Sequence, residues 1–243
     1  MFLETFLRTV GARKNLLSHG CPGRNLALPP LHYILEAMSF AEMASQVAET
    51  ARDCYVRGWA PGTSGNFSAV VSADPFRLAI TRSGADKRTI SDDAIVEIDD
   101  RGRVVSGSGR PSAEASIHLA IARVRGAGAI LHTHSIWSTI LSDAAPSAGL
   151  VIEGFEMLKG LDGVHTHEHR ECLPVLDNTQ DWAGAVPRIE SLLGANPEAH
   201  GFLIRRHGLY TWGRRLADAK RQLEVLEFLF EVMGRKRGMT WQP

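Results

Sequence analysis

The stretch AILHTHS, residues 129–135, constrains this chain more than any other, because an apolar run ends there in two histidines one residue apart. The run is typical of a buried strand, and side chains two positions apart on a strand point to the same face of its sheet. His132 and His134 are therefore placed to share one metal ion, with Thr133 on the opposite face. The same spacing arises easily by chance in a chain with 10 histidines, so a metal site needs a further ligand.

A candidate third ligand follows a second apolar strand, GFLI, at residues 201–204. In the sequence RRHGLYTWG, His207 is followed by Gly208, which permits a tight backbone turn. A third histidine on a neighbouring strand would complete three nitrogen ligands and leave one coordination position for water or substrate. Catalytic zinc sites have this open arrangement, whereas structural zinc sites are closed by four protein ligands. The residues thus predict one zinc ion per chain, bound by His132, His134 and His207.

The wider pattern of the chain predicts an α/β fold. Short strand-like runs follow one another through turns, and the turn DDRG separates the third run from the fourth. The strand-like runs are residues 67–72, 77–81, 94–98, 103–106, 127–135 and 200–213. Helical periodicity is found in residues 40–54, 111–126, 135–141, 181–197 (interrupted or begun at Pro187) and 216–233. We therefore expect a single three-layer domain in which helices cover both faces of a mixed, largely antiparallel sheet.

The first residues of the chain differ from the rest, because turn-forming residues interrupt any sustained period there. We expect residues 1–37 to be an N-terminal extension that need not be ordered, with Met38 as an alternative start. Residues 38–243 are expected to form the catalytic domain.

Composition narrows the class of function. Lys and Arg total 27, as do Asp and Glu, so the chain lacks the basic excess expected of a nucleic-acid binder. No apolar stretch reaches the roughly 18 residues needed to span a bilayer. The three cysteines are scattered and odd in number, which favours the reducing cytoplasm over a disulfide framework. We expect a cytoplasmic protein with a small-molecule substrate and without a nucleic-acid or membrane partner.

Two short loops combine glycines with hydroxyl side chains: TSGNFS at residues 63–68 and TRSGADK at residues 81–87. Backbone N–H groups in such loops can form a concave site for an anion, and the Ser83 hydroxyl and the Lys87 charge would add to it. Taken alone, each loop is explained as well by ordinary turn chemistry.

The order of five motifs, G-N-x-S, S-G-x-x-K, S-x-E, H-x-H and R-H-G, resembles the class II aldolase/adducin family from about Phe40 to Arg235. The resemblance implies the class II aldolase fold, the three histidine ligands and a ring of four subunits with active sites near subunit boundaries. It also implies a sugar-phosphate site, for which the matching positions are Gly65, Asn66, Ser83, Gly84 and Lys87, with Ser112 as a further candidate. Ser112 has a plainer explanation as the N-cap of the helix that follows.

Within the family, the segments EGFEMLKGL (153–161) and THEHRECLPVLDNTQD (166–181) are most similar to the enzymes that dehydrate 5-methylthioribulose 1-phosphate in methionine salvage. This likeness implies Glu156 as the catalytic acid/base. Glu114, in S-x-E, matches the proton shuttle of the family's aldolases and is expected to contact the substrate or the metal-bound water. Glu114 also suits the first turn of a helix on electrostatic grounds alone, and Glu156 could be an ordinary solvated residue.

Three alternatives stay open at this point. A sugar-phosphate aldolase or a pentulose-phosphate 4-epimerase would use the same metal ligands, since all three reactions begin with a polarised carbonyl. An adducin-like interaction module would share the fold without catalysis. His165, His167 and His169 could form a second metal cluster if they lay on one strand, although an exposed role is the simpler reading, and His118 is expected to be a packed or capped residue rather than a ligand.

Overall fold

The computed structural model describes residues 38–238, which all fall in one compact unit, and the extension expected at residues 1–37 lies outside the described residues. An eight-stranded sheet has the order β4-β3-β2-β1-β5-β10-β9-β8 and is antiparallel except for the pair β8–β9. Its strands are β1 Asn66–Ala73, β2 Phe76–Thr81, β3 Ile95–Ile98, β4 Val104–Ser106, β5 Ala129–Thr133, β8 Val175–Leu176, β9 Gly201–Ile204 and β10 Gly208–Gly213. The expected mixed, largely antiparallel sheet is confirmed.

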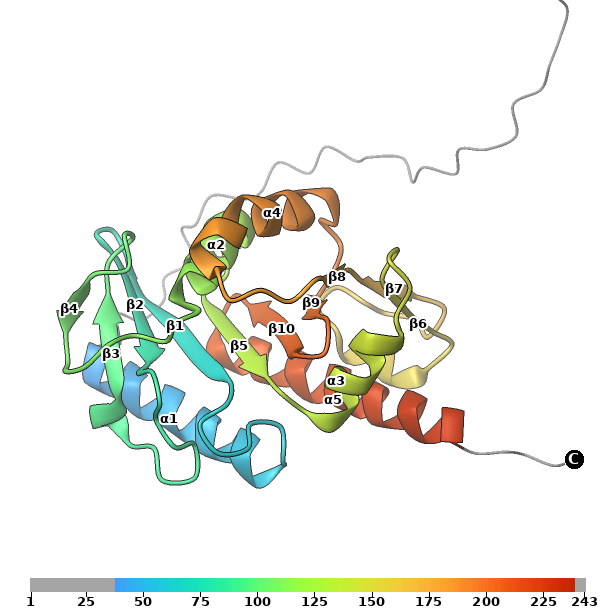
Figure 1. Cartoon of the computed structure of the whole chain (residues 1–243), viewed down its shortest axis with the longest axis horizontal. Coiled ribbons are helices and arrows are strands. Elements are labelled where there is room, and N and C mark those ends of the chain that lie inside the picture. Colours follow the sequence, from blue (N-terminus) through green and yellow to red (C-terminus); the bar gives the residue numbers. More distant parts are fainter. Residues whose placement is uncertain (1–37, 239–243) are drawn as a thin grey trace, which may run out of the picture. The chain divides into compact units, whose positions relative to one another are not determined.

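Helices cover both faces of this sheet, as Figure 1 shows. The helices α2 (Ala115–Arg125) and α4 (Trp182–Ala195) pack on one face, and α1 (Phe40–Val56) and α5 (Leu216–Gly238) pack on the other. The short helix α3 (Ile136–Ala144) lies against α5. The remaining elements are the 3₁₀ helices η1 (Asp92–Ala94) and η2 (Glu156–Gly160) and a separate two-stranded sheet of β6 (Leu150–Glu153) and β7 (Arg170–Leu173). The expected three layers are present.

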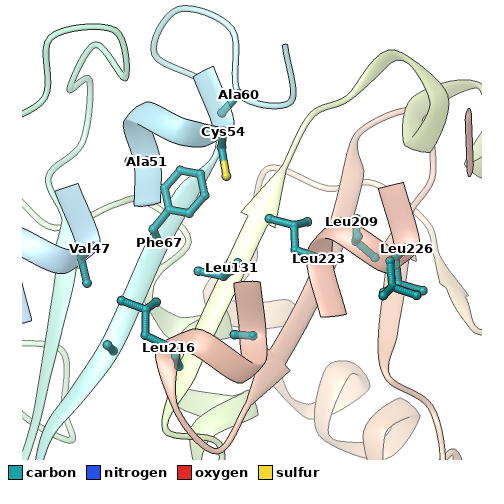
Figure 2. Close-up of a cluster of buried hydrophobic side chains, with 14 of the residues drawn as sticks. Val47, Ala51, Cys54, Ala60, Phe67, Leu131, Leu209, Leu216, Leu223 and Leu226 are labelled. Carbon is teal, nitrogen blue, oxygen red and sulfur yellow. The ribbon is translucent and has the colours of Figure 1, made fainter. Parts of the chain in front are cut away.

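Alternation along β5 divides the core into two layers and orients the metal candidates. Ile130 packs among the buried residues of α2 and α4, whereas Leu131 packs with Phe67 of β1 and Leu223 of α5 (Figure 2). Because side chains two apart share a face, His132 points to the α2/α4 side. Thr133 points to the other side, where its hydroxyl donates a hydrogen bond to Glu227 of α5 at 2.7 Å.

Helix ends follow local rules in most places, but α4 departs from the expectation that it is interrupted or begun at Pro187. The helix begins at Trp182, where the Asp181 carboxylate accepts a hydrogen bond from the N–H of Gly184 at 2.9 Å, and it continues through Pro187. Pro187 is the sixth residue of the helix, where proline removes one backbone hydrogen bond and crowds the carbonyl four residues earlier. Burial of Ile189 and Leu193 against the sheet favours continuation of the helix.

The helix expected over residues 111–126 begins only at Ala115. Pro111 forms a β-bridge with Arg82, and the N–H of Ser112 donates to the carbonyl of Thr81 at 3.1 Å, which ties this segment to the end of β2. Residues 111–114 therefore form part of a loop at the sheet's end rather than a helical turn. Among residues 38–238, every helix is too short or too polar to cross a bilayer.

Candidate metal centre and its cavity

Three imidazoles meet where β5 ends beside the turn between β9 and β10. The Nε2 atom of His134 lies 2.8 Å from that of His132 and 3.0 Å from that of His207, and the Nε2 atoms of His132 and His207 are 3.4 Å apart. The register of β10 on β5, with Tyr210 opposite His132, brings the third histidine to the first two. All three predicted ligands thus face a common point.

The protonation of these rings fits a bound cation. His132 donates from Nδ1 to the carbonyl of Leu209 at 2.8 Å, and His207 donates from Nδ1 to Asn178 Oδ1 at 3.3 Å, so the Nε2 atoms of both rings carry lone pairs. Burial lowers the pKa of all three rings, that of His134 to about 2. Converging lone pairs repel one another unless a cation lies between them, and tetrahedral zinc would hold such nitrogens roughly 3.3 Å apart. The group could hold a metal ion.

The turn that presents His207 is held from outside the site. Arg205 donates from Nη1 to the carbonyls of Ser142, Asp143 and Ala145 at the end of α3, and Arg206 adopts a left-handed backbone with a φ of 57°. A Cβ atom on Gly208 would overlap the carbonyl oxygen of Thr133. Glycine is thus required at this position because the two strands approach closely.

Glu114 lies beside the three imidazoles. One carboxylate oxygen, Oε2, is 3.3 Å from His132 Nε2, and the other, Oε1, is 3.5 Å from His207 Nε2. Oε2 also accepts hydrogen bonds from Asn66 Nδ2 and from the Tyr210 hydroxyl, both at 2.7 Å. One oxygen is therefore occupied by two donors, and Oε1 is the freer of the two.

A cavity of about 310 Å³ opens in front of these groups. Its walls contain nine of the sequence-predicted residues: Gly65, Asn66, Ser83, Gly84, Lys87, Ser112, Glu114, His134 and His207. His132 is fully buried at its base. The two glycine-containing loops therefore meet at the candidate metal centre, although they lie on either side of a β-hairpin.

Lys87 is a buried cation of this cavity, only 1% exposed, and Arg82 also contributes to the lining. Its ammonium group donates to the carbonyls of Thr63 and Ala85, each at 2.9 Å, which leaves a third N–H for an anion. Burial lowers the pKa of Lys87 to about 8. The nearby Gly65 has a φ of 74°, and a Cβ atom there would come within 2.7 Å of the carbonyl oxygen of His132, so glycine lets this loop approach the metal ligands.

Two candidates for the sugar-phosphate site, Asn66 and Ser112, line the cavity and also contact the residues beside it. The side-chain amide of Asn66 is bonded to Glu114 through one N–H and to His118 through its oxygen, which leaves one N–H for an anion. Ser112 is not the helix N-cap, because α2 begins at Ala115 with Glu114 as its cap residue. The Ser112 hydroxyl accepts from the N–H of Glu114 at 3.3 Å and so helps to fix that residue at the cavity wall.

Glu156 is not brought to the metal candidates within its own chain. It lies on η2 with 73% of its side chain exposed, and it is not among the residues that line the cavity. Its carboxylate is 2.6 Å from Lys159 and 3.8 Å from His167. The hydrogen bond from Lys159 lowers the pKa of Glu156.

The HTHEH segment does not form one strand face, because β7 begins only at Arg170. His165 and His167 are exposed. His169 instead joins Glu171 and His200, whose ring nitrogens lie 2.9 and 2.8 Å from the same Glu171 oxygen. His200 Nε2 also donates to the carbonyl of Asp162 at 2.8 Å. This second cluster combines residues that the sequence analysis did not connect.

Other residues at the site were not predicted from the sequence. Tyr210, whose ring stacks on His132 at 4.0 Å, was part of an expected strand, and only its position opposite His132 could have indicated its role. Burial raises the pKa of Tyr210 well above its usual range, so its hydroxyl remains a donor. Trp182 lines the cavity with its ring 5.6 Å from that of His207. His118 is fully buried on α2, as a packed histidine would be.

Comparison with known proteins places these features in a family. Residues 45–233 match the family described as Class II Aldolase and Adducin N-terminal domain. The chain is 42% identical to a methylthioribulose-1-phosphate dehydratase of Pseudomonas syringae pv. tomato, over 80% of this chain and 95% of that protein. It is 40% identical to a protein of the same name from Marinobacter nauticus, over 82% of this chain and 95% of that protein.

Solved structures agree with this placement at the level of the fold. An L-fuculose 1-phosphate aldolase superposes with a TM-score of 0.68 at 21% identity, covering 85% of this chain and 93% of the aldolase. The resemblance drawn from the five motifs is confirmed. The chain belongs to the class II aldolase and adducin family.

Proposed function

We propose that this protein dehydrates 5-methylthioribulose 1-phosphate to 2,3-diketo-5-methylthiopentyl 1-phosphate, as a hydro-lyase of methionine salvage in the cytoplasm. The observation that carries the proposal is the convergence of three neutral imidazoles and one buried carboxylate on a cavity that also contains a buried lysine. The names of its relatives at about 40% identity support the choice of substrate.

We propose zinc as the metal, one ion per chain, held by His132, His134 and His207, because three imidazoles and an open position suit catalytic zinc. When bound, zinc would act as a Lewis acid that polarises the C2 carbonyl of the substrate. The neutral state of the three rings supports this assignment, since protonated imidazoles cannot bind a metal ion.

The sugar phosphate is assigned to the two loops around Lys87. The free N–H of its ammonium group, the Ser83 hydroxyl and the backbone at Gly65 and Gly84 all line the same cavity. An anion beside Lys87 would stabilise its charged form. A phosphate bound there would place the carbon chain of the substrate across the cavity, toward Glu114.

Dehydration removes a proton from C3 and a hydroxyl group from C4. We assign the C3 proton to Glu114 Oε1, the carboxylate oxygen without a close donor. The electron pair left at C3 forms a double bond to C2 while the carbonyl pair moves onto the C2 oxygen. When the C2 carbonyl re-forms, the C2–C3 pair shifts to C3–C4 and the C4–O bond breaks, so that the hydroxyl takes a proton and leaves as water. Ketonisation of the resulting enol gives the diketone. Acid/base assistance of this kind contributes about 10²–10⁴-fold to a rate.

Protonation of the departing hydroxyl is assigned to Glu156, as the resemblance implies. Because Glu156 is exposed and ionised by Lys159 in its own chain, this role requires a neighbouring subunit whose cavity it enters. The proposed ring of four would supply that neighbour. Exposed apolar side chains of Ile136 and Ile140 on α3, immediately after the ligand strand, support an assembly on this side of the cavity.

The test is incubation of metal-loaded protein with 5-methylthioribulose 1-phosphate, fuculose 1-phosphate and ribulose 5-phosphate in turn. We expect a diketone from the first substrate and no turnover of the other two. A His207→Gln variant, which lacks one ligand, serves as the control for contaminating activity. Release of a triose from fuculose 1-phosphate would overturn the proposal.

An aldolase or 4-epimerase reaction is the second candidate, because Glu114 lies beside the imidazoles at the position of the aldolases' proton shuttle. The same assay separates these candidates by their products. A non-enzymatic, adducin-like module is the third, and purified protein without any bound metal would favour it.

A further inference from the structure

A chain of buried hydrogen bonds runs behind Glu114, away from the cavity. Asn66 donates from Nδ2 to Glu114 Oε2 at 2.7 Å, its Oδ1 contacts His118 Nε2, and His118 Nδ1 lies 2.7 Å from the Ser68 hydroxyl. Ser68 and His118 are completely buried, and Asn66 is 6% exposed. The chain joins two residues of β1 to one residue of α2.

The donors and acceptors of these hydrogen bonds can be assigned in order, starting from the Glu114 carboxylate. The Glu114 carboxylate can only accept, so the Asn66 NH₂ group must face it and Asn66 Oδ1 must face His118. His118 therefore donates from Nε2. Burial lowers the pKa of His118 to about 4, so the ring is neutral with a single proton, and Nδ1 must accept from the Ser68 hydroxyl. The reversed amide of Asn66 would place two oxygens against each other.

We propose that His118 is a positioning residue: through Asn66 it fixes the side chain of Glu114 so that Oε1 faces the cavity and the metal centre. Asn66 and Tyr210 hold Oε2, which leaves Oε1 as the oxygen that moves the proton. The inference rests on the proposed function in one respect, that Glu114 takes a proton from the substrate.

A role in packing alone does not account for His118. Its neighbours on α2, Ile117 and Ile121, are apolar and fully buried, and an apolar side chain would fill the same place. Burying an imidazole is costly unless both nitrogens are bonded, and here both are. The two bonds have a specific consequence, because they fix the orientation of the Asn66 amide.

The first test compares His118→Phe with His118→Gln in metal-loaded protein. Phenylalanine keeps a ring but removes the donor to Asn66, and we expect kcat for the methylthio sugar phosphate to fall about 10–100-fold. KM and metal content should stay unchanged, because His118 does not line the cavity. Glutamine retains an N–H donor and should recover most of kcat.

Ile121→Ala is the matched control, since Ile121 is buried on the same helix and has no link to Glu114. It should lower the thermal midpoint and leave kcat unchanged. Equal losses of kcat in the phenylalanine and glutamine variants, or none in either, would overturn the proposal. If the phenylalanine variant does not fold, His118→Leu takes its place in the same comparison.

A second measurement needs neither a variant nor a substrate. Nitrogen-15 NMR of histidine-labelled wild-type protein should show His118 as the neutral ring with its proton on Nε2 between pH 6 and pH 8. A proton on Nδ1 instead would reverse the direction of these hydrogen bonds and contradict the proposal. If the wild-type protein leaves the methylthio sugar phosphate unchanged, the proposed function fails. The spectrum still shows in which direction the hydrogen bonds from His118 to Asn66 and Ser68 run.

Discussion

Residues 38–238 contain two groups of possible metal ligands that differ in chemistry, one of three histidines and one of two histidines and a glutamate. His132, His134 and His207 bring three Nε2 atoms to within 2.8–3.4 Å of one another. In the second group, His169 and His200 each lie 2.8–2.9 Å from one oxygen of Glu171. Both groups have the residue types and the spacing of a metal site.

What separates the groups is whether their close atoms are matched as donors and acceptors. In the first group the Nε2 lone pairs of His132 and His207 face each other, and burial lowers the pKa of all three rings. In the second, both nitrogens of His200 face acceptors, Glu171 and the carbonyl of Asp162. Burial alone would lower the pKa of His200, but the hydrogen bond and charge of Glu171 raise it overall. We infer that the first group binds a cation and that the second is an ion pair that fastens residues 162–171 to the start of β9.

The largest expected effect tests this contrast directly. His207→Gln should abolish metal binding and lower activity at least about a thousandfold, since carbonyl polarisation by a metal ion is worth several kcal/mol. His200→Gln should change neither metal content nor kcat. Elemental analysis of the wild-type protein and both variants measures the difference. Two ions per wild-type chain, one of them lost in His200→Gln, would contradict the contrast.

A smaller effect is expected at the carboxylate beside the first group. Glu114→Gln keeps the hydrogen bonds from Asn66 and Tyr210 but cannot take a proton, so kcat should fall about a hundredfold. Metal content should stay at the wild-type level, because Glu114 is not needed as a ligand. Parallel kinetics of Glu156→Gln show how the two glutamates divide the work. If Glu114→Gln kept the wild-type kcat, the C3 proton of the substrate would have to be taken by another group.

The first group could be predicted from the sequence because its information is local. An apolar strand ending in H-x-H fixes the shared face of His132 and His134, and a glycine after His207 marks a tight turn beside another strand. The loops around Gly65 and Lys87 needed the family's motif order to be joined, since each alone resembles an ordinary turn. The three-layer fold followed from the order of short strands and amphipathic helices.

The second group could not be predicted, because its members meet only through tertiary structure. Glu171, on β7, and His200, immediately before β9, lie 29 residues apart. The strands β6 and β7 have four residues each, too few for a periodic signal. The bonds of Asn66 to Glu114 and His118 likewise depend on how β1 packs against α2. The position of Glu156 relative to a second copy stays a prediction of the resemblance.

Stability, rather than activity, should change in the second group. Replacing His200 by leucine leaves the buried Glu171 carboxylate with only part of its partners, and the free energy of unfolding should fall by about 3 kcal/mol. Arg123→Gln, which breaks an exposed pair with Glu190, should cost less than about 1 kcal/mol. Denaturant unfolding of both variants gives the comparison. Equal losses would mean that the second group is no stronger than a surface ion pair.

The smallest effect is a difference in the sign of the pH dependence. The pKa of His200 is raised above its reference of 6.5, so its contribution to stability is complete below pH 6.5 and is lost as the pH rises through the folded pKa. Glu171 has a lowered pKa, because the bonds and charge of His200 outweigh the opposite effect of burial, and its contribution is lost only at acidic pH.

The rings of the first group have lowered pKa values, so in metal-free protein they cost stability as the pH falls below 6.5. Denaturant unfolding of metal-free wild type, His200→Gln and His134→Gln from pH 5.5 to pH 9 measures the pH dependence of both groups. The advantage of wild type over His200→Gln should shrink with rising pH. Its disadvantage against His134→Gln should shrink as well, because His134 in the unfolded chain is no longer protonated above pH 6.5. A wild-type advantage over His200→Gln that grew toward pH 9 would show that His200 is neutral, and the second group would then share the chemistry of the first.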